Sequence, residues 1–210
     1  MDAPTPAILK KPSVYAPKNG VDKERIERAV REILYAIGDD PQREGLLDTP
    51  KRVAKAYEEM FSGLASDPFE VLGTVFHENY RDIVMVRNIE VSSFCEHHLL
   101  PFRGTASIGY LPAKEGGVVG LSKLARLVEV FARRPQVQER LTTQIADALE
   151  AALDAEGVIV EIECEHSCMS FRGVKKSGST TVTSTLRGVF RDDPQQQAMV
   201  LNLLRGGNKS

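Results

Sequence analysis

The sequence predicts an α+β fold with an antiparallel sheet, preceded by N-terminal helices and closed by a C-terminal helix. Apolar residues recur at helical spacing near the N-terminus, and the period switches to two from about residue 83. The predicted strands then come in pairs separated by helix pairs, in the order α-α-β-β-α-α-β-β-α. A doubly wound parallel sheet would alternate single strands with single helices, so this order favours the α+β class.

Two amphipathic helices are predicted to follow a proline-rich arm. Residues 1–20 hold four prolines and no amphipathic period, so we expect a flexible arm there. The first helix, 22–38, has Asp22 as its N-cap. The second is expected to have Thr49 as its cap and Pro50 as its first residue.

The paired strands and their helices fill the rest of the chain. Alternating apolar residues predict the first strand, which runs into the sequence Cys-Glu-His-His, and a partner strand follows it. Ser122 is expected to cap the next helix, which Pro135 stops. The expected ranges are 83–91 and 103–111 for these strands, 137–156 for the second helix, 158–164 and 179–190 for the second strand pair, and 193–204 for the last helix.

Composition excludes several classes of function. The net charge of −2 gives no general attraction to nucleic acid, and no apolar run is long enough for a signal peptide or a membrane span. Three cysteines, an odd number, fit a disulfide framework badly. We therefore expect a cytoplasmic protein, in which cysteine beside histidine indicates metal binding or catalysis.

The sequence SFCEHHLLPF, residues 93–102, is the strongest candidate for a metal site. Cys95 and His98 lie three positions apart, so one turn of chain can bring both to a single ion. Further ligands are available in ECEHSCMSFRG, residues 163–173, where Cys164, His166 and Cys168 would share one face of an extended strand. Spacing alone leaves the third ligand open. The alternative is that these cysteines are small buried hydrophobic residues.

Two further stretches are weaker signals. Basic residues gather at the start of the Ser122 helix and after Cys168, and a helix N-terminus favours phosphate, so a substrate with a polyphosphate group is plausible. The stretch RRPQVQERLT, residues 133–142, is most simply an exposed first turn of a helix. The basic residues are Lys123, Arg126, Arg172, Lys175 and Lys176.

Together these motifs resemble the GTP cyclohydrolase I family. The resemblance rests on SxCEHH, GLSKLAR, RPQVQERLT, His-x-Cys-Met at residues 166–169 and Arg172-Gly173, and it extends from about residue 22 to 204. It implies a Zn²⁺-dependent enzyme that converts GTP and water to formate and 7,8-dihydroneopterin triphosphate, for folate or tetrahydrobiopterin synthesis. It also implies a role for each matching residue. These are Cys95, His98 and Cys168 as zinc ligands, His97, His166 and Ser122 in catalysis, and Gln138, Glu139, Lys123, Arg126, Arg172 and Arg52 in substrate binding.

The resemblance further implies the tunnelling fold, with its ββαα units, in a homodecamer with active sites between subunits. The expected divisions are the arm 1–20, an N-terminal helical region 21–64 and a catalytic domain 65–210. Two other functions are consistent with the residues. One is a nucleotide-binding module with structural zinc and Cys164 as fourth ligand, and the other is a hydrolase of a different purine nucleotide.

Overall fold

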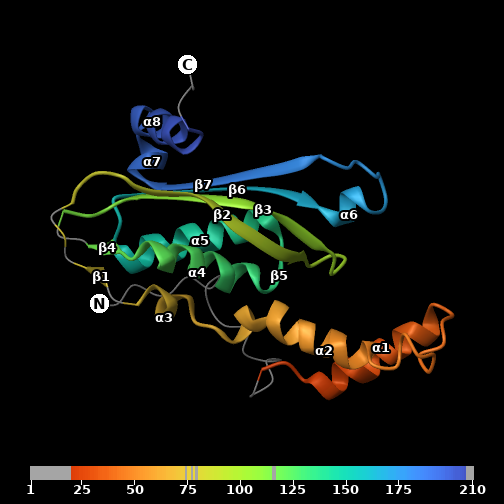
Figure 1. The fold of residues 1–210 in the computed structure, drawn as a ribbon. Helices are drawn as coiled ribbons and strands as arrows, with labels where there is room; N and C mark the ends of the chain where they lie inside the picture. Colours follow the sequence, from red (N-terminus) through yellow and green to blue (C-terminus); the bar gives the residue numbers. More distant parts are fainter. Residues whose placement is uncertain (1–19, 74, 77, 79, 115–116, 207–210) are drawn as a thin grey trace.

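A mixed five-stranded sheet forms the centre of the computed structural model, which describes residues 20–73, 75–76, 78, 80–114 and 117–206. The strand order is β5-β2-β3-β6-β7 (Figure 1). The α+β class is confirmed. The sheet is not purely antiparallel, because β5 pairs with β2 in parallel through Phe94 and Pro135. The strands are β2 (Val84–Cys95), β3 (Pro101–Leu111), β5 (Pro135–Gln136), β6 (Gly157–His166) and β7 (Thr180–Gly188).

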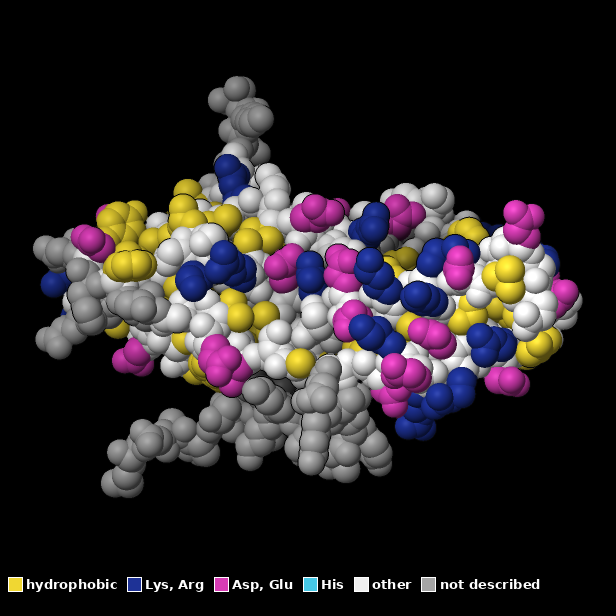
Figure 2. All heavy atoms as spheres, turned by 60° about the horizontal axis from the view of Figure 1, so that its bottom comes forward, with side chains coloured by type: hydrophobic (Ala, Val, Ile, Leu, Met, Phe, Trp, Pro, Cys, Tyr) yellow, Lys and Arg dark blue, Asp and Glu magenta, His cyan; other side chains and the backbone are white. Residues whose placement is uncertain are grey.

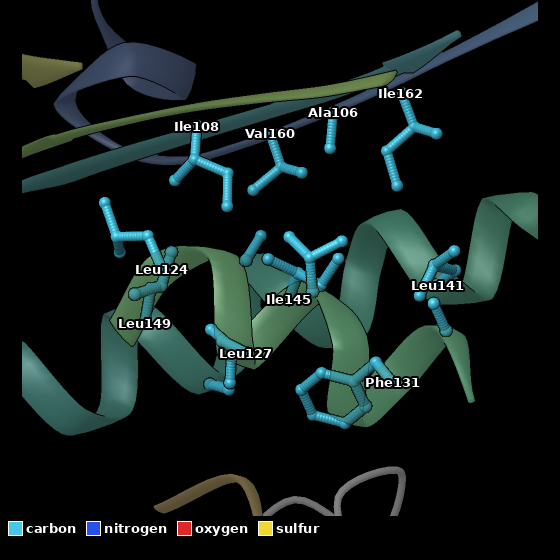
Figure 3. Close-up of a cluster of buried hydrophobic side chains, with 14 of the residues drawn as sticks. Ala106, Ile108, Leu124, Leu127, Phe131, Leu141, Ile145, Leu149, Val160 and Ile162 are labelled. Atoms are coloured by element: carbon cyan, nitrogen blue, oxygen red, sulfur yellow. The ribbon is translucent and has the colours of Figure 1, made fainter. Parts of the chain in front are cut away.

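Helices α4 (Leu121–Ala132) and α5 (Gln138–Leu153) cover one face of this sheet and close the main core. Figure 3 shows side chains of β3 and β6 pointing down onto the apolar faces of both helices. Leu127, Ile145 and Val160 are fully buried there. Burial of such side chains contributes about 1.5–3 kcal/mol each, so this layer fixes the sheet that carries the site.

The opposite face of the sheet is covered at one end by α7 (Val189–Asp192) and α8 (Pro194–Leu204) (Figure 1). Ile159 and Phe190 pack there with Val200. Asp193, expected as the first residue of the last helix, is instead the N-cap of α8, and its carboxylate accepts from two backbone N–H groups. The predicted strand 179–190 was too long, because Gly188 turns the chain with a φ of 56° and α7 begins at Val189.

The N-terminal region is a helical hairpin of α1 (Lys23–Ala36) and α2 (Thr49–Met60) beyond the core (Figure 1). Asp22 caps α1 as predicted. Asp48, and not Thr49, precedes α2, so Pro50 is its second residue. The predicted arm lies outside the described residues, apart from Gly20. Figure 2 shows acidic and basic side chains mixed over this hairpin rather than gathered into a patch of one sign.

Buried Arg134 connects α4 to the segment that follows the helical hairpin. Its guanidinium donates to Val130 O at 2.9 Å and to Ser66 O at 3.3 Å, and it lies over the Phe131 ring. Burial lowers the Arg134 pKa, opposed by the charge of Asp67. Ser66 follows the 3₁₀ turn η2 (Ser62–Ala65) and leads to α3 (Pro68–Leu72). The contact therefore holds α3 against the core.

A two-stranded sheet of β1 (Val75–Phe76) and β4 (Val118–Val119) lies at the start of α4. The buried Tyr110 hydroxyl accepts from Val119 N at 3.0 Å and so fixes that start to the end of β3. Gly120, and not Ser122, is the N-cap of α4. Among the described helices, none combines the length and the apolar character needed to cross a membrane.

Candidate metal centre and nucleotide site

The turn between β2 and β3 carries the Cys-Glu-His-His sequence. Cys95 ends β2, and its N–H donates to Leu100 O at 2.9 Å while its carbonyl accepts from Leu99 N at 2.8 Å. Leu99 has a φ of 52°, a left-handed conformation that an L-residue adopts only under constraint. These bonds close a tight turn that presents the Cys95 and His98 side chains together.

An ion pair joins this turn to the start of α5. Nη1 and Nη2 of Arg140 contact the Glu96 carboxylate, at 2.6 and 2.9 Å respectively. Arg140 lowers the Glu96 pKa chiefly through this hydrogen bonding, so the carboxylate is ionised at neutral pH. The Glu96 N–H also donates to Gln136 O at 2.9 Å. The turn and the helix start are thus connected by a bidentate pair and a backbone bond.

Three side chains form a group that can hold a metal ion. One ligand atom each of Cys95, His98 and Cys168 lies within 4.8 Å of the others. Cys168 comes from the short helix α6 (Ser167–Ser170), which follows β6. Burial raises the Cys168 pKa, and the neighbouring Cys95 raises it further. A divalent cation would relieve this crowding of two sulfurs, and two thiolates with one imidazole are a donor set that zinc accepts.

Cys164 is not part of this group. It is 1% exposed and belongs to the core beneath the sheet, as expected for a strand residue facing inward. Burial, with a smaller effect of Glu163, raises the pKa of its thiol to about 12. The expected alternation of Cys164, His166 and Cys168 on one face fails at Cys168, because β6 ends at His166 and the chain turns into α6.

Two histidines outside this group lie next to it. His97 Nδ1 is 3.7 Å from Cys95 Sγ, and the His97 side chain is exposed. His166 stacks on Phe102 with ring centroids 4.5 Å apart and an interplanar angle of 9°. Burial lowers the His166 pKa, opposed by the charge of Glu139.

The first turn of α5 holds two adjacent residues in opposite environments. Glu139 is exposed, as the sequence predicts for this stretch, whereas Gln138 is 2% exposed. The Gln138 amide contacts His166 Nε2 at 2.8 Å and strands β6 and β7. The interpretation of an exposed helix start is therefore correct for Glu139 and wrong for Gln138.

The comparison with known proteins decides the family. The model of GTP cyclohydrolase I matches residues 26–205. The chain belongs to the GTP cyclohydrolase I family. The candidate ligands Cys95, His98 and Cys168, called the metal group below, all lie within the matched range.

Three bacterial relatives named GTP cyclohydrolase 1 show how similar the chain is to other family members. The Thermobifida fusca protein is 56% identical over 89% of this chain and 90% of its own length. The Corynebacterium aurimucosum protein is 58% identical over 88% and 94%. The Mycobacterium tuberculosis protein is 56% identical over 87% and 91%. Among solved structures, an archaeosine synthase QueF-like protein in the apo form has 16% identity and a TM-score of 0.39 over 52% of this chain and 96% of that one.

In this member of the GTP cyclohydrolase I family, the basic residues lie in separate places. Arg172 is beside the metal group, with Nη1 3.2 Å from His98 Nε2. Arg52 on α2 contacts Gly45 O and Thr49 Oγ1, each at 3.2 Å. Ser122, Lys123 and Arg126 occupy the first two turns of α4.

The start of α4 is distant from the metal group within one chain. It follows Val119, which is bonded to Tyr110 at the far end of β3. The metal group lies at the other end, where β3 begins at Pro101. Tyr110 is nine steps along the strand from Pro101, a length of about 30 Å at ~3.3 Å per residue.

Three contacts of the site depend on tertiary structure that the sequence pattern did not reveal. Arg140 was recognised only as part of a helix start, and its pairing with Glu96 across 44 positions has no local signal. The stacking of Phe102 on His166 follows from the β3–β6 register, in which the two residues are partners. The anchoring of Gln138 likewise depends on where β7 lies.

Proposed function

We propose that the protein is a zinc-dependent GTP cyclohydrolase I, which converts GTP and water to formate and 7,8-dihydroneopterin triphosphate. This is the first step towards the pterin of folate or tetrahydrobiopterin. The observation that carries the proposal is the family match over residues 26–205, which includes the clustered Cys95, His98 and Cys168.

In this proposal Cys95, His98 and Cys168 hold the zinc ion. The fit is supported by the close approach of their ligand atoms and by the preference of Zn²⁺ for sulfur and nitrogen donors. Zinc held by three protein ligands supplies an activated water molecule at neutral pH. Such a water would be the nucleophile for carbon 8 of guanine, and the resulting hydration would open the imidazole ring and lead to release of formate.

We assign the proton transfers to His97 and His166. Imidazole has a pKa near neutral pH, so it can accept a proton from water and return one to a departing purine nitrogen. Both rings lie beside the proposed zinc ligands: His97 contacts Cys95 Sγ, and His166 lies two positions before Cys168. Ser122 is assigned to the later ribose rearrangement and ring closure by its match to the family motif.

Recognition of GTP is divided between base and phosphate contacts. The exposed Glu139 carboxylate can accept from guanine N1–H and the 2-amino group, a pattern that adenine does not offer. The resemblance also assigns Gln138 to substrate binding, although its side chain is 2% exposed and its amide contacts groups of the protein. Lys123, Arg126, Arg172 and Arg52 are the proposed triphosphate ligands, with arginine providing bidentate contacts.

We further propose that each active site is shared between copies of the chain, as in a tunnelling-fold homodecamer built from ββαα units. The metal group and the start of α4 lie at opposite ends of β3, farther apart than a nucleoside triphosphate can reach. A neighbouring copy can supply the missing half. β7 lies at one edge of the sheet, and an unpaired strand edge is a natural site for pairing with a second copy.

The division of the chain and its location belong to the same proposal. The boundary between an N-terminal helical region, 21–64, and a catalytic domain, 65–210, lies in the η2 turn. A cytoplasmic location suits an enzyme whose three cysteines are free thiols.

The test is incubation of the purified protein with GTP, following formate release and the ultraviolet change that accompanies pterin formation. We expect both products, their loss on treatment with a chelator and their return on addition of Zn²⁺. Binding of GTP without formate release in the zinc-loaded protein would contradict the proposal and favour a binding module with structural zinc.

A further inference from the structure

Gln138 has a buried amide group that is completely surrounded by hydrogen-bond partners. Its Nε2 lies 3.0 Å from Ile162 O on β6, 2.9 Å from Thr181 O on β7 and 3.1 Å from Thr183 Oγ1. Its Oε1 lies 2.8 Å from His166 Nε2. The side chain is 2% exposed, so water does not compete for these contacts.

The two backbone carbonyls determine which way the amide points. A carbonyl oxygen only accepts hydrogen bonds, so the atom that faces Ile162 O and Thr181 O must be the NH₂ group. The opposite orientation would place Oε1 against both oxygens and leave buried acceptors unpaired, at a cost of about 1–3 kcal/mol each. Oε1 is therefore fixed toward His166.

A fixed acceptor determines the state of the imidazole. Because Oε1 cannot donate, His166 Nε2 must carry a hydrogen and donate it to Gln138. In the neutral ring the other nitrogen, Nδ1, is then the only basic atom. The Phe102 ring, stacked at an interplanar angle of 9°, holds the plane of the imidazole from one side.

We infer that Gln138 is a positioning residue that holds His166 in the Nε2–H tautomer and leaves Nδ1 as the atom that exchanges protons with the substrate. This inference rests on the proposed function, in which His166 is a catalytic residue. It gives Gln138 a role different from contact with ribose or guanine, since both amide hydrogens are already directed at groups of the protein.

A neutral amide suits a residue that gives as well as takes protons. The amide oxygen can accept from Nε2–H whether the ring is neutral or charged. Proton exchange at Nδ1 then requires no rearrangement of the ring or of its partner.

The test compares kcat and KM for GTP in Gln138→Met, Gln138→Glu and a control, Thr185→Val, using the zinc-loaded enzyme. Met keeps the length of the side chain but has neither an amide donor nor an oxygen acceptor, so we expect kcat to fall about 10- to 100-fold with KM within about 2-fold. A buried Glu is neutral and provides one O–H donor and one carbonyl acceptor, so it should recover about tenfold of the loss. Thr185→Val removes a similar hydroxyl contact between α5 and β7, to Thr143, and should leave both constants unchanged.

A double-mutant comparison shows whether Gln138 acts through His166. Adding Gln138→Met to His166→Ala should change single-turnover formate release by less than about 2-fold, because the residue it positions is already absent. A full additional loss in the double mutant, or a rise in KM with unchanged kcat in Gln138→Met, would overturn the inference.

If Gln138→Met does not fold, Gln138→Glu alone tests the inference, and a raised KM in that variant would indicate substrate contact and overturn it. Failure of the wild-type enzyme to release formate would refute the proposed function instead.

Discussion

At the scale of single residues, Cys164 and Cys168 differ far more than their spacing of four positions implies. Cys164 is buried in the apolar core with a pKa of about 12, so its thiol stays protonated at neutral pH. Cys168 lies in α6 with its sulfur near Cys95 and His98. A cysteine binds a metal as the thiolate, and a bound cation stabilises that form at neutral pH.

This contrast predicts different outcomes for three serine variants. Cys95→Ser and Cys168→Ser should each lose bound zinc and activity, because a hydroxyl is a poor substitute for a thiolate ligand. Cys164→Ser should keep bound zinc and activity, and only its free energy of unfolding should fall. The measurement is the zinc content of each purified variant. Loss of zinc from Cys164→Ser, with zinc kept by Cys168→Ser, would refute the proposed ligand set and support the structural-zinc alternative.

Base and phosphate recognition can be separated at the same scale. Glu139→Gln should weaken the binding of GTP and of guanosine alike, by roughly 10-fold or more. The reason is that an amide replaces the charged acceptor and presents a donor to the guanine donors. Arg172→Ala should strongly weaken the binding of GTP and leave the binding of guanosine almost unchanged, because guanosine has no phosphate. Affinities of both ligands for both variants provide the check. Equal losses of GTP and guanosine in Arg172→Ala would place the arginine in the base pocket or the fold.

At the scale of elements, the β3–β6 pairing depends on a close backbone approach at Gly104. A Cβ at this position would collide with Glu163 O, which belongs to the partner strand and cannot move independently. Gly104→Ala should therefore lower the free energy of unfolding by about 3 kcal/mol or more. Gly45→Ala is the matched control, since its Cβ meets only the flexible end of Arg43, and we expect a change within about 0.5 kcal/mol. Denaturant unfolding of both variants tests this, and equal stabilities would contradict it.

Elements were predictable where the signal is local. The cap of α1 was identified correctly because Asp22 accepts a backbone N–H group within the first turn of the helix, and the expected start of α8 at residue 193 is one residue early. β5 was not predicted, since a strand of only Pro135 and Gln136 has no period and pairs only because Phe94 and Cys95 lie opposite. The end of β7 was misplaced because apolar residues continue past Gly188, at Val189 and Phe190, where the chain has already bent into α7.

Site residues show the same division between local and distant signals. The Cys95 and His98 pair could be found from spacing, and the resemblance added Cys168. The anchoring of Gln138 could not be found, because its partners lie 24 and 43 positions away on two other strands. Contacts between segments so far apart depend on the assembled sheet and not on any periodic pattern.

At the scale of the whole molecule, the proposed sharing of each active site between copies of the chain predicts complementation between two inactive variants. Lys123→Ala removes a proposed phosphate contact and Cys168→Ser removes a proposed ligand, so each homo-oligomer should lose most of its activity. In a mixed assembly, some sites combine the intact half of one subunit with the intact half of another. Random mixing should restore about a quarter of the sites when each is shared by two chains.

The measurement is formate release from the co-expressed variants, purified through a different tag on each chain. A mixture of the separately purified variants, never assembled together, is the control and should stay inactive. Mixed assemblies with no activity above either parent would show that both halves serve the same chain.

The turn that carries Cys95 and His98 is held in shape by contacts that do not depend on a metal ion. Its shape is held by the backbone bonds to Leu100 and Leu99 and by the Glu96–Arg140 pair, none of which includes an ion. Zinc fingers, by contrast, gain their fold only from the metal. Here most of the conformational entropy of the turn is already lost on folding. A newly made chain would therefore already hold this turn in shape and could bind the proposed zinc ion without refolding.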